Sequence, residues 1–345
     1  MSPSTPAATA TVRSPVRIGV LGLGAIAQTA HLPVLAKMRG VTIAALCDND
    51  AAKARSLAQR FGVRDICTDV EELLELEGLD AVVVATPNHL HEVHVLSALR
   101  AKKHVLCERP LGLNARAVER VIAAAEKAKK VVMVANNHRF RHDAQALDAF
   151  VRSGELGKVR SVRAGAYRRR VQQAAWRLRR AEAGGGAFLE LGLPLLDLAG
   201  WLLDFPRVER VSAAVERGRG ANAVEESAIV FIECQGGFTV TIDVHANYIG
   251  EDQRWWFELI GTQGSARLNP LRLIKEIHGQ PVDVSPTGAQ TKDTAFIQSY
   301  RSELAHFVAA VRDEAPYEPP RDQVRVYKLL EMIYKAADDA KELRP

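Results

Sequence analysis

Apolar and polar residues follow two alternating patterns over the first part of the chain. Short, nearly continuous apolar runs recur, and between them apolar residues stand three or four positions apart. Continuous runs are typical of strands buried on both faces, and the wider spacing is typical of amphipathic helices. Strands are predicted at residues 16–21, 41–47, 81–85, 104–107 and 131–135. Helices are predicted at residues 25–38, 51–61, 70–76, 90–101 and 115–128. This alternation predicts a doubly wound parallel sheet with helices on both faces.

The pattern changes after about residue 139. A helix at residues 143–153 and a strand at 159–167 precede an arginine-rich loop and a helix at 187–203. Longer strands follow, and the stretch FTVTIDVH alternates apolar and polar residues, which predicts a sheet with one covered face. These strands are predicted at residues 208–215, 227–233, 238–246 and 255–260. Loop and short-strand material is predicted at 263–292, and helices at 295–312 and 322–341.

These patterns divide the chain into three segments. Residues 1–15 are rich in proline, serine, threonine and alanine, and we expect a flexible leader there rather than a signal peptide. Residues 16–138 form the predicted Rossmann domain. Residues 139–345 form the second predicted α/β domain, whose two final helices are expected to pack back on the first domain.

Composition places the chain among ordinary globular proteins. Of its 345 residues, 47% are hydrophobic and 25% are charged, and the net charge of +5 is too mild for a dedicated nucleic-acid binder. No apolar stretch reaches about 18 residues, so no membrane span is expected. Cys47, Cys67, Cys107 and Cys234 lie far apart, and three of them end apolar runs. We expect buried, reduced thiols and a cytoplasmic protein.

A glycine-rich turn follows the first predicted strand. Gly22 permits a tight turn, Gly24 has no side chain to hold off a pyrophosphate, and Ala27 is small enough for close helix packing. The next helix begins at Ala25 and Ile26, where free N–H groups and the positive end of the helix dipole favour an anion. Because strand, turn, helix and second strand follow in the required order, the pattern predicts a dinucleotide site.

Asp48 directly follows the second predicted strand. Its distance from Gly24 is close to the spacing of about 20 residues expected for an acid that holds the adenosine ribose hydroxyls. A carboxylate at that position repels a 2′-phosphate, so NAD is expected in preference to NADP. Because DNDAAKA also has the composition of a helix start, a helix cap is the alternative role for this region.

Five further segments occur together in one order. They are ATPNHLH at 85–91, CERP at 107–110, NNHRF at 136–140, AAWR at 174–177 and GGGAFLELGLPLLD at 184–197. This ordered set resembles the glucose–fructose oxidoreductase, inositol dehydrogenase and MocA family over essentially the whole chain after the leader. The resemblance implies a C-terminal α/β domain with a large open, mostly antiparallel sheet. It also implies a homodimer or homotetramer formed through that sheet, and a small-molecule substrate.

The resemblance also implies roles for individual residues. Glu108 is expected to hold ribose, and Arg109, whose bond to Pro110 is often cis in the family, is expected to approach the nicotinamide. Other positions are expected beside the pyrophosphate and nicotinamide ribose or along the same cleft. These are Thr86, Asn88, His91, Asn137, Trp176 and Arg177.

The chain departs from the family at three positions of the expected active site. Arg109 replaces a lysine, so it can polarise a substrate oxygen but cannot readily release a proton. Glu190 replaces an aspartate and keeps a carboxylate that can assist proton transfer. Pro194 replaces a histidine and has no titratable group. Water, His138 and His142 are further candidates for accepting the proton, whereas the retained Asp197, three residues after Pro194, is expected to be structural.

Two clusters of charged or polar residues suggest other sites. Arginines crowd the segment before the GGG stretch, which fits either an anionic substrate or a solvated or intersubunit charge patch. They are Arg163, Arg168, Arg169, Arg170, Arg177, Arg179 and Arg180. His89, His91 and His94 have a spacing that could suit a metal, but carboxylates nearby are few, so no metal site is predicted.

Three functions remain open from the sequence. The first is an NAD(P)-dependent oxidoreductase that transfers hydride between nicotinamide and a small polar substrate, sugar-like or acidic. The second is a catalytically inactive dinucleotide-binding sensor or partner protein, because Pro194 and Arg109 depart from the usual residues. The third is an NAD-dependent glycoside-cleaving enzyme. We favour the oxidoreductase, and reduction of a carbonyl or imine is as plausible as alcohol oxidation, because solvent can supply a proton.

Overall fold

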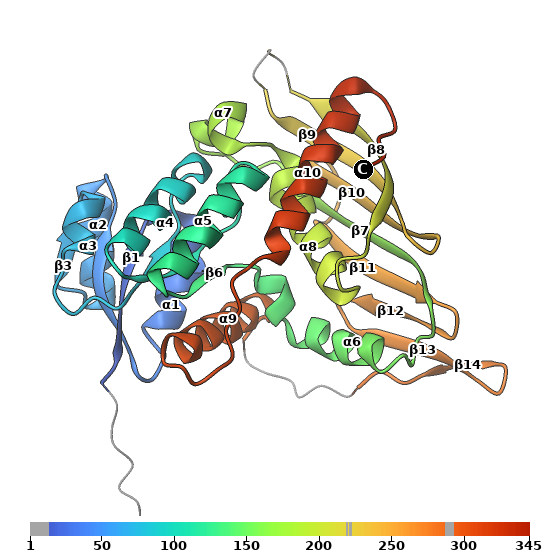
Figure 1. Ribbon diagram of the computed structural model, residues 1–345, viewed down its shortest axis with the longest axis horizontal. Coiled ribbons are helices and arrows are strands. Elements are labelled where there is room, and N and C mark those ends of the chain that lie inside the picture. Colours follow the sequence, from blue (N-terminus) through green and yellow to red (C-terminus); the bar gives the residue numbers. More distant parts are fainter. Residues whose placement is uncertain (1–13, 219, 221–222, 287–292) are drawn as a thin grey trace, which may run out of the picture.

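The computed structural model describes residues 14–218, 220, 223–286 and 293–345. Nearly all of the expected leader, residues 1–15, therefore lies outside the described residues. Two sheets stand side by side in the described chain, each with its own helices (Figure 1). This arrangement confirms an α/β fold with a parallel sheet followed by a mostly antiparallel one.

The first sheet is parallel throughout its described strands, in the order β3-β2-β1-β4-β5-β6. The expected apolar runs form its centre, and β4 is buried at each of its four positions. The strands are β1 (Val16–Leu21), β2 (Val41–Cys47), β3 (Asp65–Cys67), β4 (Ala81–Val84), β5 (His104–Cys107) and β6 (Val132–Val134). The sequence analysis missed β3, because this short edge strand exposes its first two residues and so lacks a continuous apolar run.

The helices of the first half begin and end at recognisable capping residues. Asp50 accepts hydrogen bonds from the N–H groups of Ala52 and Lys53, and Gly62 ends the same helix in the left-handed conformation. Asn114 caps a later helix through the N–H of Ala117. These helices are α1 (Leu32–Leu35), α2 (Ala51–Phe61), α3 (Val70–Leu74), α4 (His91–Arg100) and α5 (Ala115–Ala128).

Two helices contain a widened π turn just before a proline. Ala27–His31 precedes Pro33, and Phe188–Gly192 precedes Pro194, with the proline two residues after the π turn in both cases. A proline ring clashes with the carbonyl four residues earlier and supplies no N–H, and a widened turn relieves both problems. Pro194 is therefore accommodated inside a continuous helix. The first of these helices was expected to extend to residue 38, but α1 ends at Leu35.

The second sheet has the described order β14-β13-β12-β11-β7-β10-β9-β8. Its neighbours are antiparallel except for β7 and β10, which confirms a mostly antiparallel sheet. Residues 263–292, expected to be loop and short-strand material, contain β12 and the hairpin of β13 and β14. The strands are β7 (Val159–Arg169), β8 (Val208–Arg217), β9 (Glu225–Cys234), β10 (Phe238–Tyr248), β11 (Arg254–Gly261), β12 (Gly264–Leu268), β13 (Arg272–Ile277) and β14 (Gln280–Asp283).

Helices cover one face of this second sheet (Figure 1). Helix α8 (Leu193–Leu202) lies on β7 and β10, and α10 (Asp322–Asp339) crosses β8. The helical run Arg180–Leu202, which includes α7 (Arg180–Ala183), is long and apolar enough to span a membrane, although Glu190 interrupts it. Because 72% of its apolar window is buried inside the protein, it has the character of a core helix.

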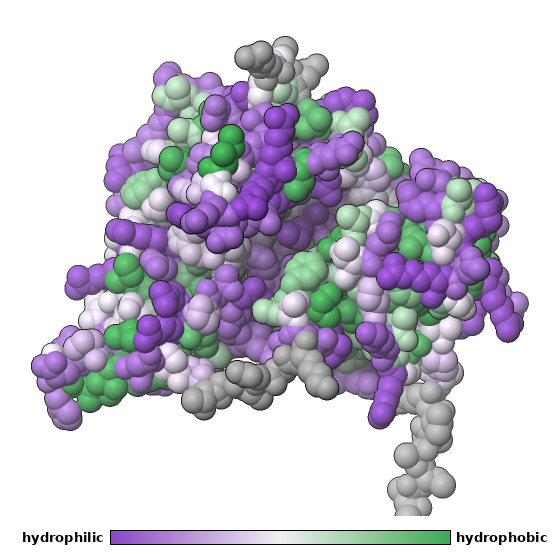
Figure 2. Space-filling view, turned by 180° about the vertical axis from the view of Figure 1, so that it is seen from behind, coloured by the Kyte–Doolittle hydropathy of each residue, from purple (hydrophilic) through white to green (hydrophobic). Residues whose placement is uncertain are grey.

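The remaining helices connect the two halves. Helix α9 (Ala295–Val311) contacts α1, and α10 contacts α5, so both final helices touch the first half of the chain. Helix α6 (His142–Arg152) follows the short turn Asn137–Phe140 that leaves β6. Seen from behind, the molecule has a recess between its two halves whose walls are largely polar (Figure 2). The carboxyl ends of the parallel strands are where such a fold places its ligands.

Candidate active site

The glycine-rich turn after β1 has the geometry of a nucleotide cradle. Gly22 has a φ of +89°, and a Cβ there would lie 2.6 Å from the carbonyl carbon and oxygen of Ala85. Gly24 faces open space, with no described atom within 4 Å of an added Cβ. Ala25 and Ile26 begin the helix that follows, and Ala27 is fully buried. The turn therefore leaves space at Gly24 beside a helix N-terminus, as a pyrophosphate requires.

Asp48 lies at the end of β2 and is tied to this turn. Its Oδ2 accepts a hydrogen bond from the N–H of Leu23 at 2.7 Å, and its Oδ1 lies 2.9 Å from Nζ of Lys53. Burial raises the pKa of this carboxyl, but hydrogen bonds from the N–H groups of Asp50 and Leu23, and then from Lys53, leave the pKa below its usual value. The group is therefore an anion at neutral pH, as the expected preference for NAD requires.

The loops after β4 and β5 are fastened together by His91. Its Nδ1 lies 2.7 Å from the carbonyl oxygen of Pro110, and its Nε2 lies 2.7 Å from that of Thr86. Because the imidazole is 1% exposed and both nitrogens face carbonyls, its contacts position the loops rather than reach into the recess. The Arg109–Pro110 bond is cis, as the resemblance implies. Asn88 donates to the carbonyl oxygen of Ala183, which links the β4 loop to α7.

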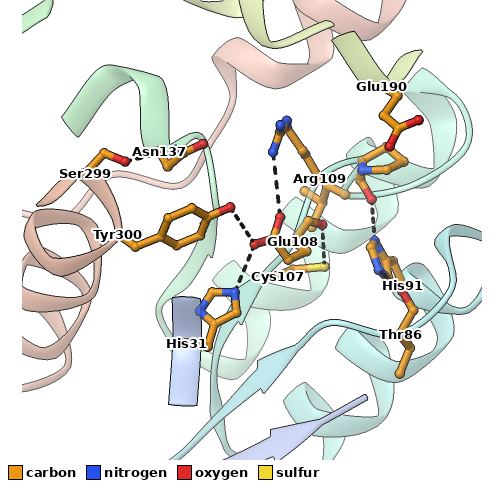
Figure 3. Close-up of polar contacts among 12 residues, drawn as sticks. His31, Thr86, His91, Cys107, Glu108, Arg109, Asn137, Glu190, Ser299 and Tyr300 are labelled. Carbon is orange, nitrogen blue, oxygen red and sulfur yellow. Dashed lines mark hydrogen bonds and ion pairs between the residues drawn. The ribbon is translucent and has the colours of Figure 1, made fainter. Parts of the chain in front are cut away.

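Glu108 is held by two residues that the sequence analysis did not identify. Its Oε1 lies 2.9 Å from Nε2 of His31 and accepts a hydrogen bond from the hydroxyl of Tyr300 at 3.3 Å (Figure 3). Burial raises the pKa of Glu108, but the hydrogen bond from His31 and the charges of His31 and Arg109 bring it below its usual value. Neither His31 nor Tyr300 belongs to a recognisable motif, and α9 brings Tyr300 here from a distance of 192 residues.

Arg109 lies where several parts of the fold meet. Its NH1 is 3.8 Å from Oε2 of Glu108, and its side chain is 23% exposed. Burial lowers its pKa, but Tyr300, Glu108 and Glu303 raise it above the ordinary arginine value. Asn137, on the neighbouring loop after β6, donates to the hydroxyl of Ser299 on α9 at 2.9 Å. The structure therefore gives Arg109 a permanent positive charge that is partly open to the recess.

Glu190 is clamped by two arginines. Arg168 donates to both carboxylate oxygens, at 2.7 and 2.8 Å, and Arg177 donates to Oε1 at 3.0 Å. Burial raises the pKa of Glu190, but Arg168, Arg177 and Arg109 together bring it below its usual value. The carboxylate is therefore a stable anion with its oxygens already engaged, which makes it a weak proton acceptor. Arg177 also stacks 4.6 Å from the ring of Trp176, which is partly exposed.

About two turns of helix separate Glu190 from Asp197, and the two carboxylates on either side of Pro194 have different environments. Glu190 faces the arginines, whereas Asp197 is 1% exposed and binds Arg139, with Nε to Oδ2 at 2.7 Å. Asn136 and Gln323 also donate to Oδ1 of Asp197. These bonds connect the loop after β6, α8 and α10, so Asp197 is structural, as expected from the sequence. Pro194 itself is buried and offers no polar atom where a family histidine stands.

His138 is a titratable side chain with unmet hydrogen-bonding capacity near Arg109. Its ring meets that of Trp255 edge to face at 5.4 Å, and its buried Nδ1 has no partner among the described residues. Burial, followed by the charges of Arg109 and Arg141, holds its pKa well below the ordinary histidine value. The residue as a whole is half-buried. The structure thus places a neutral imidazole on the loop next to the one that carries Arg109.

Most of the arginines in the crowded segment have partners. Arg179 pairs with Glu182, Arg180 pairs with Asp338, and Arg169 donates to the carbonyl of Gly250. Ion pairs and hydrogen bonds within the protein therefore engage most of these arginines, so the segment does not form one open anion site. No group of three or more His, Cys, Asp or Glu residues in the described part of the chain has the geometry of a metal site.

Glu303 on α9 supplies a prediction about stability. It is fully buried, neither carboxyl oxygen has a partner in the described ranges, and burial, followed by the charge of Glu108, raises its pKa well above the ordinary value. The folded chain keeps a proton that the unfolded chain releases above about pH 4.3, so stability falls as pH rises from there towards the folded pKa. We expect Glu303→Met to raise the free energy of unfolding at pH 8 by about 1–3 kcal/mol.

Urea unfolding of the two proteins at pH 5 and pH 8 measures this effect. The gain should be clearly smaller at pH 5, because this pH lies only slightly above the pKa of the unfolded chain and the cost of keeping the proton grows with each further pH unit. An equal change at both pH values would show that Glu303 is not protonated in the fold.

Comparison with known proteins places the chain in a family. The model described as "Oxidoreductase family, NAD-binding Rossmann fold" matches residues 16–136, and the "GFO/IDH/MocA C-terminal domain" matches residues 144–267. The chain is 30% identical to myo-inositol 2-dehydrogenase of Thermotoga maritima over 72% of this chain and 74% of that protein. It is 32% identical to D-glucoside 3-dehydrogenase of Escherichia coli, but this match covers only 57% of the relative's length and 58% of the chain.

A solved structure extends the similarity to nearly the full length. GenD2 from gentamicin A biosynthesis, in complex with NAD, superposes with a TM-score of 0.83 and 25% identity over 99% of both chains. The comparison therefore covers both sheets of the chain. The chain belongs to the GFO/IDH/MocA family of NAD-binding oxidoreductases.

Proposed function

We propose that the protein is an NAD-dependent oxidoreductase that oxidises a secondary alcohol of a small polyol or sugar, or reduces the corresponding carbonyl. The observation that carries this proposal is the partly exposed Arg109, which lies 3.8 Å from Glu108 after β5, together with the open cradle at Gly24 after β1. The family relationship supports the same reaction, since relatives include myo-inositol 2-dehydrogenase and D-glucoside 3-dehydrogenase. Neither the structure nor the relatives favour a sensor or a glycoside-cleaving enzyme over this function.

The residues present fit NAD. Gly24 leaves space for the pyrophosphate, Asp48 offers an anionic carboxylate for ribose hydroxyls, and Glu108 is a fixed anion at the end of β5. Thr86, whose hydroxyl lies 3.0 Å from Nδ1 of His94, stands on the loop between them. Bound NAD supplies the hydride acceptor, and the protein must position the alcohol and receive its proton.

We assign the role of accepting the alcohol's proton to His138 rather than to Glu190. Oxidation of an alcohol transfers a hydride to the nicotinamide and leaves one proton, which needs an unprotonated acceptor. Both carboxylate oxygens of Glu190 are engaged by Arg168 and Arg177, whereas Nδ1 of the neutral His138 has no partner among the described residues. The positive charges of Arg109 and Arg141 make the protonated imidazole unfavourable, so it passes the proton on to solvent.

Arg109 has the complementary role in this mechanism. Its guanidinium stays charged and donates hydrogen bonds to the reacting oxygen, which stabilises negative charge as the proton leaves. Glu190 keeps Arg168 and Arg177 in place on the opposite wall, where Trp176 and Arg177 border the substrate. In the reverse direction solvent resupplies His138, and the same residues stabilise the developing alkoxide.

Three finer features belong to the same proposal. The cations Arg109, Arg168 and Arg177 outnumber the anions Glu108 and Glu190 by one charge, which favours a substrate with an acidic group. The uncovered face of the second sheet carries Tyr167 against Trp256, a surface suited to pairing two subunits as a homodimer or homotetramer. Four buried, free cysteines fit the reducing cytoplasm.

The test of the proposed function is turnover measured by NADH absorbance. The purified protein is offered NAD⁺ with inositols, aldoses, sugar acids and glycosides, and NADH with the matching ketones. We expect turnover on at least one polyol or sugar, and a lower rate with NADP⁺. If calorimetry shows that NAD⁺ binds but no member of the panel is turned over, the proposed reaction is wrong.

A further inference from the structure

A second cavity lies away from the recess, in the layer between the sheet and its covering helices. It has a volume of about 490 Å³ and is lined by residues of α8, α10 and strands β8, β9 and β10. Figure 1 shows where these elements lie in the fold. Leu196, Ala199 and Leu203 line it from one side of α8, at helical spacing. None of the residues lining it belongs to the nucleotide cradle or to the contacts of Arg109 and Glu190.

The walls of this cavity are mostly apolar, and three cationic side chains and Pro345, the last residue of the given sequence, also border it. Ile232 and Val240 from the sheet and Leu329 and Met332 from α10 complete the walls. No acidic side chain lines it within the described ranges. Its volume falls within the range of about 300–1,000 Å³ that is typical of small-molecule sites with mainly apolar walls.

Three cationic side chains at the mouth are exposed to solvent. Lys328 lies 3.2 Å from Glu119 and is therefore paired. Arg207 and Arg325 have no carboxylate within ion-pair distance among the residues that the structure describes. An apolar cavity with two unpaired guanidinium groups at its entrance is complementary to a molecule with an aliphatic chain and an anionic head, because guanidinium matches carboxylate geometry.

We propose that this cavity binds a free medium-chain carboxylate, with the acyl chain between α8 and α10 and the carboxylate at Arg325 and Arg207. The proposal is independent of the dehydrogenase reaction, because the cavity shares no residue with that site. Burial of each methylene should tighten binding about fourfold. Lengthening the chain by two carbons should therefore tighten binding about fifteenfold, as long as the cavity has room.

Calorimetry with hexanoate, octanoate and decanoate below their micelle concentrations tests the chain, and decanol and decyltrimethylammonium test the head group. We expect one site per protein, tightening with chain length, at least tenfold weaker binding of decanol, and no binding of the cation. Leu329→Trp should block the cavity and abolish decanoate binding. Arg325→Gln should weaken the binding of decanoate until its affinity approaches that of decanol. Arg55→Gln, a matched change of an exposed arginine on α2, should have no effect.

Three results would overturn the proposal. Equal affinity for decanoate and decanol would show a purely apolar void, and decanoate binding that survives Leu329→Trp would place the site elsewhere. If none of the carboxylates binds, and Leu329→Trp lowers the oligomeric mass in sedimentation, the cavity is covered by a second copy of the chain. Circular dichroism and NAD⁺ binding confirm that the variants are folded, and neither measurement depends on finding the enzyme's substrate.

Discussion

Asp197→Ala is expected to lower the free energy of unfolding by about 3–5 kcal/mol. The carboxylate is 1% exposed and accepts hydrogen bonds from Arg139 and Asn136 on the loop after β6 and from Gln323 on α10. Removing it leaves the buried Arg139 with Asp322 as its remaining acidic partner. Urea unfolding followed by circular dichroism measures the change in the free energy of unfolding, because these hydrogen bonds break when the chain unfolds.

The matched control for this change is Asp197→Asn. It keeps the shape and an acceptor oxygen but not the charge, so we expect a loss smaller than that of the alanine variant. Glu119→Ala, which removes the partner of Lys328, tests an exposed ion pair and should cost below about 1 kcal/mol. If Asp197→Ala costs no more than Glu119→Ala, the contacts of Asp197 do not hold the halves together.

His138→Gln is expected to lower kcat for alcohol oxidation by about 10²–10⁴-fold, the usual contribution of a general base. NAD⁺ affinity should stay close to that of the parent, because the side chain acts on the substrate proton. In the parent, kcat should remain level as pH falls through 6.5, since the low pKa keeps the imidazole unprotonated there. Steady-state NADH formation over a pH series measures both effects.

Two controls separate proton transfer from a structural role of His138. Added imidazole should restore part of the activity of a His138→Ala variant, which a merely structural residue would not allow. Glu190→Gln should raise KM more than it lowers kcat, because Glu190 positions Arg168 and Arg177. A large fall in kcat for Glu190→Gln, with His138→Gln unaffected, would return the role of proton acceptor to Glu190.

Much of the fold could be predicted because its signals are local. The strands β1, β2 and β5 and the helices α2 and α5 have the predicted bounds, since apolar runs, Asp50, Asn114 and Gly62 mark where they begin or end. The strand β3 could not be found this way, because its position depends on pairing with β2 rather than on an apolar run. The π turns before Pro33 and Pro194 could not be predicted either. They relieve a clash between the proline ring and a backbone carbonyl, which arises only in the folded helix.

The residues of the candidate site also fall into two groups, those with a local sequence signal and those that only the fold brings together. Gly22, Gly24 and Asp48 follow from local spacing, and the structure shows open space at Gly24 and a hydrogen bond from Leu23 to Asp48. The contacts of Glu108 with His31 and Tyr300, and of Glu190 with Arg168, join distant segments. The sequence names Glu190 as a carboxylate in the cleft, but only the fold reveals that two arginines occupy it. The cofactor and catalytic contacts of the remaining family positions stay predictions.

The central claim is that this chain works as a dehydrogenase with its own residues, although Pro194 replaces the family histidine. The direct measurement compares NADH formation by the parent and by the triple variant Arg109→Lys, Glu190→Asp, Pro194→His on the same panel of polyols and sugars. We predict that the parent turns over at least one substrate without the family residues. Turnover by the triple variant alone, with NAD⁺ bound equally by both proteins, would contradict the account.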